Sequence, residues 1–176
     1  MKRRFLSLLL CTVMTASMAL TGCGNGNNAA KPSVNTDPDK QGKVLNIYCW
    51  NTEFQDRFEY FKKSGKLPSD VKVNFVITPN ENNAYQNALD AALLKQKDAA
   101  ADDKIDMFLI EADYALKYVN SDYTLDVKSI GLTDNDLSDM YQYTKDIATS
   151  SNGALKAVSW QATPGLFAYR RSIAKD

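Results

Sequence analysis

The chain has 176 residues, and its 21 basic and 21 acidic side chains give a formal net charge of zero. This balance is not that of a polyanion binder, so we expect no nucleic-acid partner. The chain contains no histidine, which excludes Ser-His-Asp and Cys-His catalysis and every His-ligated zinc site. We expect neither a metal nor a cofactor.

The first 22 residues have the features of a secretory signal. Positions 2–4 are basic, and a mainly apolar run from residue 5 to residue 20 follows. This run is shorter than the roughly 20 residues that a membrane span needs, and hydroxyl side chains interrupt it. It ends in Leu20-Thr21-Gly22-Cys23, which resembles the lipobox of bacterial lipoproteins. We therefore predict a signal peptide over residues 1–22 and lipidation of Cys23; the alternative is an ordinary signal peptide with a chance cysteine.

A polar segment follows the cysteine. Residues 24–42 are rich in Gly, Asn, Asp and Pro and contain a single branched apolar residue. Such a segment buries too little apolar surface to fold, so we predict that residues 23–43 comprise the lipidated cysteine and a flexible linker. The protein would then be exported and anchored to the outer face of the cell membrane through lipid only. Once the signal is removed, Cys49 is the only thiol besides Cys23, and an intramolecular disulfide is not expected.

The next segments alternate between strand and helix patterns. Residues 44–50 form a short β-branched and aromatic run that predicts a strand buried on both faces. A helix is expected over residues 51–63, because three phenylalanines lie on one face, and a second strand is expected over residues 71–77. The phenylalanines are Phe54, Phe58 and Phe61.

A second helix and a third strand are expected next. Residues 82–97 carry an apolar helical face with Asn80 available as the N-cap, and residues 105–110 read as a strand. A short third helix is predicted over residues 113–120. Strands separated by helices of this length predict an α/β fold with a mainly parallel sheet, flanked by helices, in which ligands bind beyond the carboxyl ends of the strands.

The remaining residues predict one more helix and two extended segments. Thr133 and Asp136 have capping-box spacing, which predicts a helix that begins at Thr133. Residues 155–160 are expected to form a fourth strand, and residues 166–171 read as extended.

Four stretches together carry a family resemblance. The lipobox with its polar tether, VLNIYCWNTEF, IDMFLIEADYALKYV and LKAVSWQATPGLFAYRRSIAKD resemble family 1 extracellular solute-binding proteins in order and spacing. These are lipoproteins of bacterial ABC importers, most often for sugars. The resemblance implies a monomeric binding protein rather than an enzyme, with a small solute and the importer's permease subunits as partners. It also implies a type II periplasmic-binding-protein-like fold of two hinged lobes, of which residues 44–176 would be the N-terminal lobe, truncated at or just after the crossing between lobes.

The candidate ligand-binding residues follow the predicted strands. Trp50, Asn51 and Glu53 come after the first strand, Asp113 after the third and Trp160 after the fourth. An indole offers a flat face for a sugar ring, while amide and carboxylate groups pair with hydroxyls. The structural alternatives are that Trp50 covers the core, that Glu53 provides a favourable charge at a helix N-terminus, and that Asp113 caps a helix. Glu111 is a further candidate beside Asp113.

Other polar and aromatic groups are interpreted as structural. Arg170 and Arg171 could bind an acidic ligand, but a solvated hinge or a salt bridge is the favoured interpretation. Tyr141 is expected in the core. The acidic residues between 134 and 139 lack the glycine and distal glutamate of an EF-hand.

Two other functions remain open from the sequence. A lipid-anchored glycoside hydrolase would use Glu53 with Glu111 or Asp113 as its carboxylate pair, and that chemistry needs no histidine. A lipoprotein that presents a bound solute to a signalling receptor would carry the same sequence features.

Overall fold

The computed structural model describes residues 40–163, 165 and 168–173. The predicted signal peptide, Cys23 and most of the predicted linker therefore lie outside the described residues. Among those described, no helix is long and apolar enough to cross a membrane.

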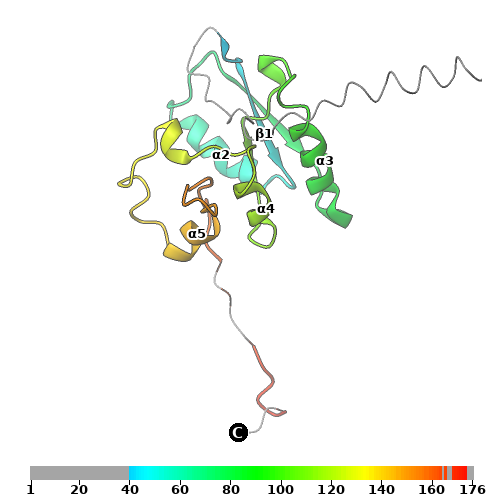
Figure 1. Ribbon diagram of the computed structural model, residues 1–176, viewed down its shortest axis with the longest axis vertical. Helices are drawn as coiled ribbons and strands as arrows, with labels where there is room; N and C mark the ends of the chain where they lie inside the picture. The colour runs from blue at the N-terminus through cyan, green and yellow to red at the C-terminus, as the bar shows by residue number, and fades with distance from the viewer. Residues whose placement is uncertain (1–39, 164, 166–167, 174–176) are drawn as a thin grey trace, which may run out of the picture. The chain divides into compact units, whose positions relative to one another are not determined.

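The centre of the fold is a three-stranded parallel sheet in the order β2-β1-β3 (Figure 1). Its strands are β1 (Val44–Cys49), β2 (Lys72–Ile77) and β3 (Met107–Phe108). Ile47 of β1 is in register with Phe75 of β2, and Tyr48 is in register with Phe108 of β3. The predicted α/β class with a parallel sheet is confirmed, and the first two strands match their predicted ranges closely.

The third strand is shorter than predicted. Only Met107–Phe108 has regular strand geometry, although the backbone follows β1 on both sides of it. The Asp106 amide donates to the Asn46 carbonyl at 3.2 Å, and the Leu109 amide donates to the Tyr48 carbonyl at 2.9 Å. As an edge strand in the described part of the chain, β3 is held by one neighbour only.

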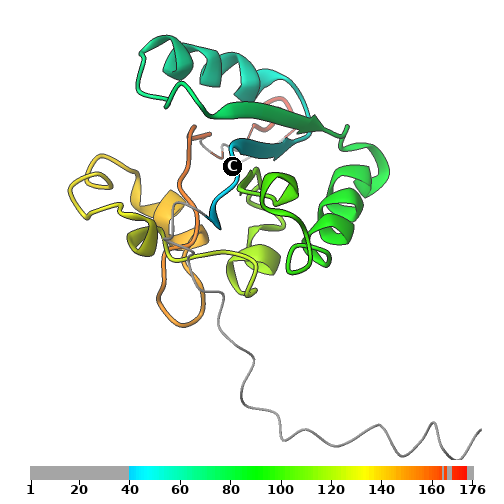
Figure 2. The ribbon, with the colours of Figure 1, turned by 90° about the horizontal axis from the view of Figure 1, so that it is seen from above.

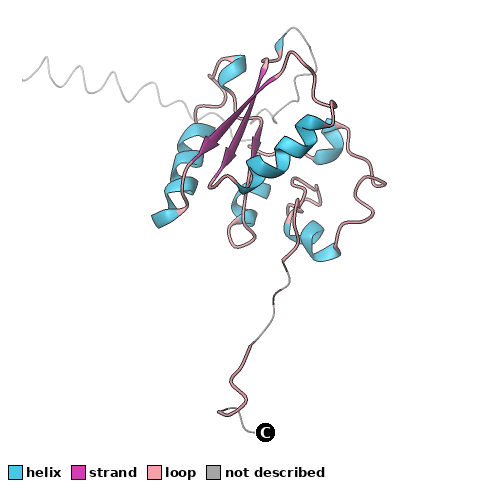
Figure 3. Ribbon diagram, turned by 180° about the vertical axis from the view of Figure 1, so that it is seen from behind, coloured by secondary structure: helices cyan, strands magenta, loops and turns pink. Residues whose placement is uncertain are grey.

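Helices cover both faces of the sheet (Figure 3). On one face, Phe58 of α2 (Glu53–Lys63) packs edge-on against Phe75, with ring centroids 5.7 Å apart. On the other face, Tyr48 and Phe108 pack against a buried cluster from α3 (Ala84–Leu93), α4 (Ala115–Val119) and the chain before β3. This division follows from the alternation of side chains along β1 and β3. The buried cluster contains Tyr85, Leu89, Leu93, Ile105 and Tyr118.

The predicted apolar stripe of α2 is only partly confirmed. Phe58 is buried and Phe54 is half-buried, but Phe61 is 44% exposed. Phe61 packs on the Phe58 ring, at a centroid distance of 5.5 Å, at the edge of the contact between α2 and the sheet.

The second helix begins later than predicted, and Asn80 does not cap it. A short 3-10 turn, η2 (Glu81–Asn83), precedes α3, and no side-chain cap bond forms at either start. Asn82 and Asn83 instead take the left-handed conformation, with φ of 51° and 61°. Asparagine tolerates this conformation better than most residues do. The third helix is also shorter than predicted, and Asp113 does not cap it because Tyr114 holds the N-cap position.

The predicted helix at Thr133 is wrong, although its capping box forms. The Thr133 amide and hydroxyl both donate to Asp136 Oδ2, at 2.8 and 2.6 Å. Residues 134–139 nevertheless form only turns, and the regular helix, α5 (Gln142–Ile147), starts further along. A cap satisfies the first amides but does not propagate a helix, which needs an apolar face to bury. Two further 3-10 turns are η3 (Ala101–Asp103) and η4 (Val127–Ile130).

The predicted fourth strand is also wrong. Leu155 makes an isolated antiparallel bridge with Thr149 and does not join the sheet. The Ser150 amide donates to the Ala154 carbonyl at 2.9 Å, so the chain folds back on itself before reaching the sheet. The predicted extended segment 166–171 falls partly outside the described residues; Ala168, Tyr169 and Arg170 have no regular structure.

The amino end of the sheet is held by one buried amide. Asn46 is 4% exposed, and its Nδ2 donates to the Asp102 and Lys104 carbonyls at 2.7 and 2.9 Å. Its Oδ1 accepts from Asn74 Nδ2 of β2 at 2.8 Å. This side chain therefore joins β1, β2 and the approach to β3.

We expect Asn46→Ala to lower the free energy of unfolding by about 1–3 kcal/mol, because it leaves several polar partners without their hydrogen bonds. Urea unfolding followed by circular dichroism measures this change. Asn74→Ala is the matched control, since Asn74 is exposed and makes only one of these bonds. Equal losses in the two variants would contradict the central role of Asn46.

Candidate functional site

The strand order creates a switch point at the carboxyl end of β1. The connection through α2 runs from β1 to β2 over one face, whereas the connection through α3 runs from β2 to β3 over the other. Figure 2 shows α2 and α4 on opposite sides of the sheet. Where successive connections leave a parallel sheet on opposite faces, a crevice opens beyond the carboxyl ends of the strands. Residues that follow β1 and β3 are therefore the candidate site.

Trp50 lies on the α3 side of this edge. It is half-buried and packs against the buried cluster, where its ring meets Tyr85 edge-on at a centroid distance of 5.5 Å. The interpretation that Trp50 covers the core is therefore confirmed as far as packing goes. Because the indole is only partly buried, core packing and ligand contact do not exclude each other.

Asn51 and Glu53 are both exposed at the start of α2. Asn51 Oδ1 accepts a hydrogen bond from the Glu53 amide at 3.0 Å, which satisfies one of the free amides at the helix start. Glu53 is the first residue of α2, where a negative charge is favourable. The structural interpretation of Glu53 thus has support, and its carboxylate still faces solvent.

Trp160 lies on the α2 side, although the strand predicted to end there does not exist. Its ring meets Phe54 edge-on at a centroid distance of 5.4 Å, and it is half-buried. Phe54 belongs to the first turn of α2, just past the end of β1. The two indoles thus flank the carboxyl end of the central strand, one on each face.

A hydrogen bond crosses the same edge. Asn80, three residues past β2, donates from Nδ2 to Glu111 Oε2 at 2.9 Å, and Glu111 lies three residues past β3. Since β2 and β3 are on opposite sides of β1, this bond spans the carboxyl end of β1. Asn80 Oδ1 and the Tyr114 hydroxyl are both buried and make no hydrogen bond of good geometry, although the Tyr114 hydroxyl lies beside the Glu111 carboxylate. We call Asn80, Glu111 and Tyr114 the edge cluster.

Asp113 is less engaged than Glu111. It is exposed, and it does not cap α4. Of the two carboxylates that follow β3, the structure places Glu111 in the edge cluster and leaves Asp113 in solvent.

Sequence reasoning missed Asn80 as a site residue and considered it only as a cap. The rule that selected residues after the first and third strands applies equally to Pro79-Asn80 after the second. That signal was available, but the contact across β1 depends on the strand order, which the residue pattern alone does not give.

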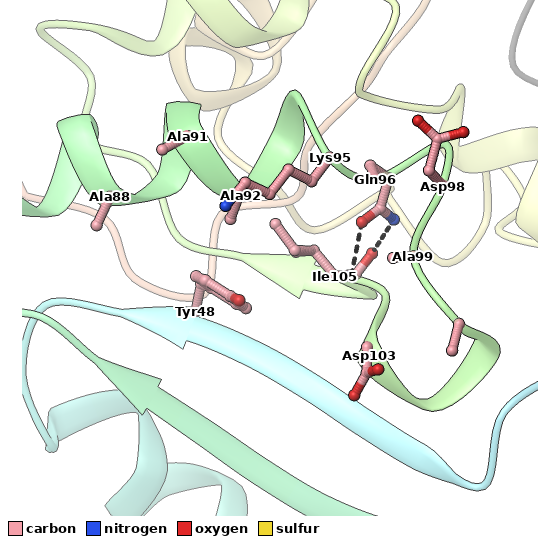
Figure 4. Close-up of a pocket in the computed structure, with 11 residues that line it drawn as sticks. Tyr48, Ala88, Ala91, Ala92, Lys95, Gln96, Asp98, Ala99, Asp103 and Ile105 are labelled. Carbon is pink, nitrogen blue, oxygen red and sulfur yellow. Dashed lines mark hydrogen bonds between the residues drawn. The ribbon is translucent and has the colours of Figure 1, made fainter.

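The other candidate features lie elsewhere. A shallow hollow of about 710 Å³ between α3 and the chain before β3 is lined by alanines together with polar and charged side chains (Figure 4). The Gln96 side chain pairs there with both backbone groups of Ile105 at 2.8 Å, so its polar atoms already have partners.

The remaining residues considered from the sequence lie away from the carboxyl edge. Arg170 and Arg171 are exposed, and Arg170 donates to Ser172. Tyr141, expected in the core, is 66% exposed and stacks on Tyr143. Within the described residues, no group of acidic or cysteine side chains has the arrangement of a metal site.

Comparison with known proteins gives no match for this chain, either among protein-family models or among curated sequences.

The raised pKa of the Tyr114 hydroxyl makes the free energy of unfolding depend on pH in the alkaline range. Burial, with the negative charges of Glu111 and Asp113, raises the pKa of its hydroxyl from 10.0 to about 12. A pKa that is higher in the folded state gives stability that is present below pH 10 and is lost as the pH rises towards about 12. Urea unfolding across this range should show a falling free energy of unfolding in the wild type. Tyr114→Phe should make the fall shallower, and an unchanged slope would contradict the assignment.

Proposed function

We propose that this protein is the solute-capturing lipoprotein of a bacterial ABC importer, binding a sugar or oligosaccharide and delivering it to a membrane permease. The described domain would be one lobe of a type II periplasmic-binding-protein-like fold, and ligand would bind at the carboxyl edge of its sheet as a second lobe closes over it. The observation that carries the proposal is the pair of half-buried indoles on the two faces of β1 at this edge.

The chemistry at the edge suits a carbohydrate. A sugar ring has apolar faces that stack on aromatic rings and hydroxyls that pair with amides and carboxylates. Trp50 and Trp160 supply the first kind of contact, and Asn51, Glu53 and Glu111 supply the second. The described site contains no histidine and no metal group, and binding of this kind requires neither.

We expect Trp160→Ala to weaken sugar binding by at least about tenfold, because ring stacking and its exclusion of water contribute more than about 1 kcal/mol. Isothermal titration calorimetry of the full-length protein against a sugar panel measures the change. Tyr60→Ala is the control, since Tyr60 is 72% exposed on α2 away from the carboxyl edge. Equal affinity in wild type and Trp160→Ala would contradict the site. Release of smaller sugars during the titration would instead favour hydrolysis.

The proposed anchor gives a separate prediction. Cys23→Ser should release the exported protein into the medium while leaving its sugar affinity unchanged, because acylation needs the thiol and the residue precedes the linker. Immunoblots of cell and medium fractions, with calorimetry on the released protein, test both parts. Retention of Cys23→Ser on cells would contradict lipidation at this residue.

A further inference from the structure

The edge cluster has an arrangement that the fold alone does not require. Its central bond, from Asn80 to Glu111, joins the loops that leave the two outer strands. The loop that carries Asn80 continues into two consecutive left-handed asparagines, Asn82 and Asn83. Residues held in sparsely populated backbone conformations cost of order 1–3 kcal/mol each and gather at functional sites.

The cluster also leaves two buried polar atoms without partners. Asn80 Oδ1 and the Tyr114 hydroxyl are closed off from solvent, and neither makes a hydrogen bond of good geometry; the Tyr114 hydroxyl lies beside the Glu111 carboxylate. An unsatisfied buried polar group costs about 1–3 kcal/mol, so native proteins keep few of them. Both atoms lie at the carboxyl edge, where the strand order places the crevice.

The hydrogen-bonding capacity that remains favours a ligand of one type. Asn80 already uses an amide hydrogen on Glu111, which leaves its Oδ1 as an acceptor. An ionised Glu111 also only accepts, while the Tyr114 hydroxyl both donates and accepts. The cluster therefore needs hydrogen-bond donors, and a sugar hydroxyl supplies a donor and an acceptor in one neutral group.

The charges around the cluster disfavour an acidic ligand. Asp113 is adjacent to Tyr114 and adds a second negative charge beside Glu111. The nearest cation along α4, Lys117, is paired with Asp90 at 2.5 Å. A carboxylate ligand would therefore bring a third negative charge to groups that mostly accept hydrogen bonds.

We propose that the edge cluster is a hydroxyl-binding subsite that selects neutral sugars over acidic ones. This inference rests on the proposed function and adds a substrate class to it. Binding requires a small rotation of Asn80 or Tyr114, since both orphan atoms are closed off in the described conformation. The ligand hydroxyl then replaces the missing partners.

The test is calorimetry on the full-length protein with matched neutral and acidic sugars, namely galactose, glucose, cellobiose and xylobiose against galacturonate and glucuronate. Wild type should bind a neutral sugar and show no heat with the acids. Tyr114→Phe should weaken that binding by about tenfold, the effect of losing roughly 1.4 kcal/mol of hydrogen bonding. Its melting temperature should change less than that of Tyr118→Phe, because the deleted hydroxyl lies beside the Glu111 carboxylate without a hydrogen bond of good geometry.

Tyr118→Phe is a matched control on the same helix. The Tyr118 hydroxyl is satisfied, donating to Asp90 Oδ1 at 3.0 Å in a partly buried position. This variant should therefore lose stability and keep its sugar affinity. The opposite behaviour of the two phenylalanine variants separates ligand contact from structural support.

Glu111→Gln tests the selection by charge and does not depend on Tyr114. It should narrow the preference for the neutral sugar and allow measurable binding of the matching acid. Neutral-sugar binding with unchanged affinity in Tyr114→Phe, or a wild type that prefers the acid, would overturn the inference and leave the proposed function standing. Absence of binding to every sugar in wild type would overturn the proposed function and the inference with it.

Discussion

The fold depends on a polar residue at a position where a parallel sheet normally places an apolar one. Asn46 is buried in the middle strand, yet both the oxygen and the nitrogen of its side-chain amide have hydrogen-bond partners. A buried amide is costly unless it is satisfied, and here satisfaction requires β2 and the chain before β3 to be in place together. The main chain of the same residue makes a further bond to the chain before β3, because the Asn46 backbone N–H donates to Asp106 Oδ2 at 2.8 Å. The register of the sheet is thereby defined at its amino end.

At the carboxyl end of the sheet, a buried aromatic residue, Tyr85, holds β1 and β3 together. The Tyr85 hydroxyl reaches the carbonyls of Leu109 and Tyr48, at 2.7 and 3.1 Å, so it bridges β3 and β1 where both strands finish. The same ring supports Trp50. An indole at the carboxyl edge is thus positioned by a buried residue of α3 that is itself tied to the sheet. Support of this kind limits the conformations open to the Trp50 side chain, so little entropy is left for it to lose in any contact it makes.

The sequence predicted the first half of the domain well and the second half poorly, for a physical reason. In residues 44–93, periodicity and burial agree, so the strands and helices follow from local pattern. In residues 133–160, the local signals were real but incomplete: the capping box of Thr133 formed without a helix, and Leu155 turned back on Thr149. The site showed the same limit. The pattern selected residues that follow the strands, whereas the contact between Asn80 and Glu111 required knowledge of which strand lies between them.

The direction of β1 has a practical consequence. The chain enters this strand at Val44, and the candidate site lies past Cys49, so the six residues at about 3.3 Å each put the entry about 20 Å from the candidate site. Whatever is joined before Val44 enters the sheet at the end opposite the candidate site. A purification tag, a dye or a surface linkage placed there would leave the binding edge clear. The N-terminal side of the domain is therefore the side through which to immobilise it when the candidate site is to stay accessible.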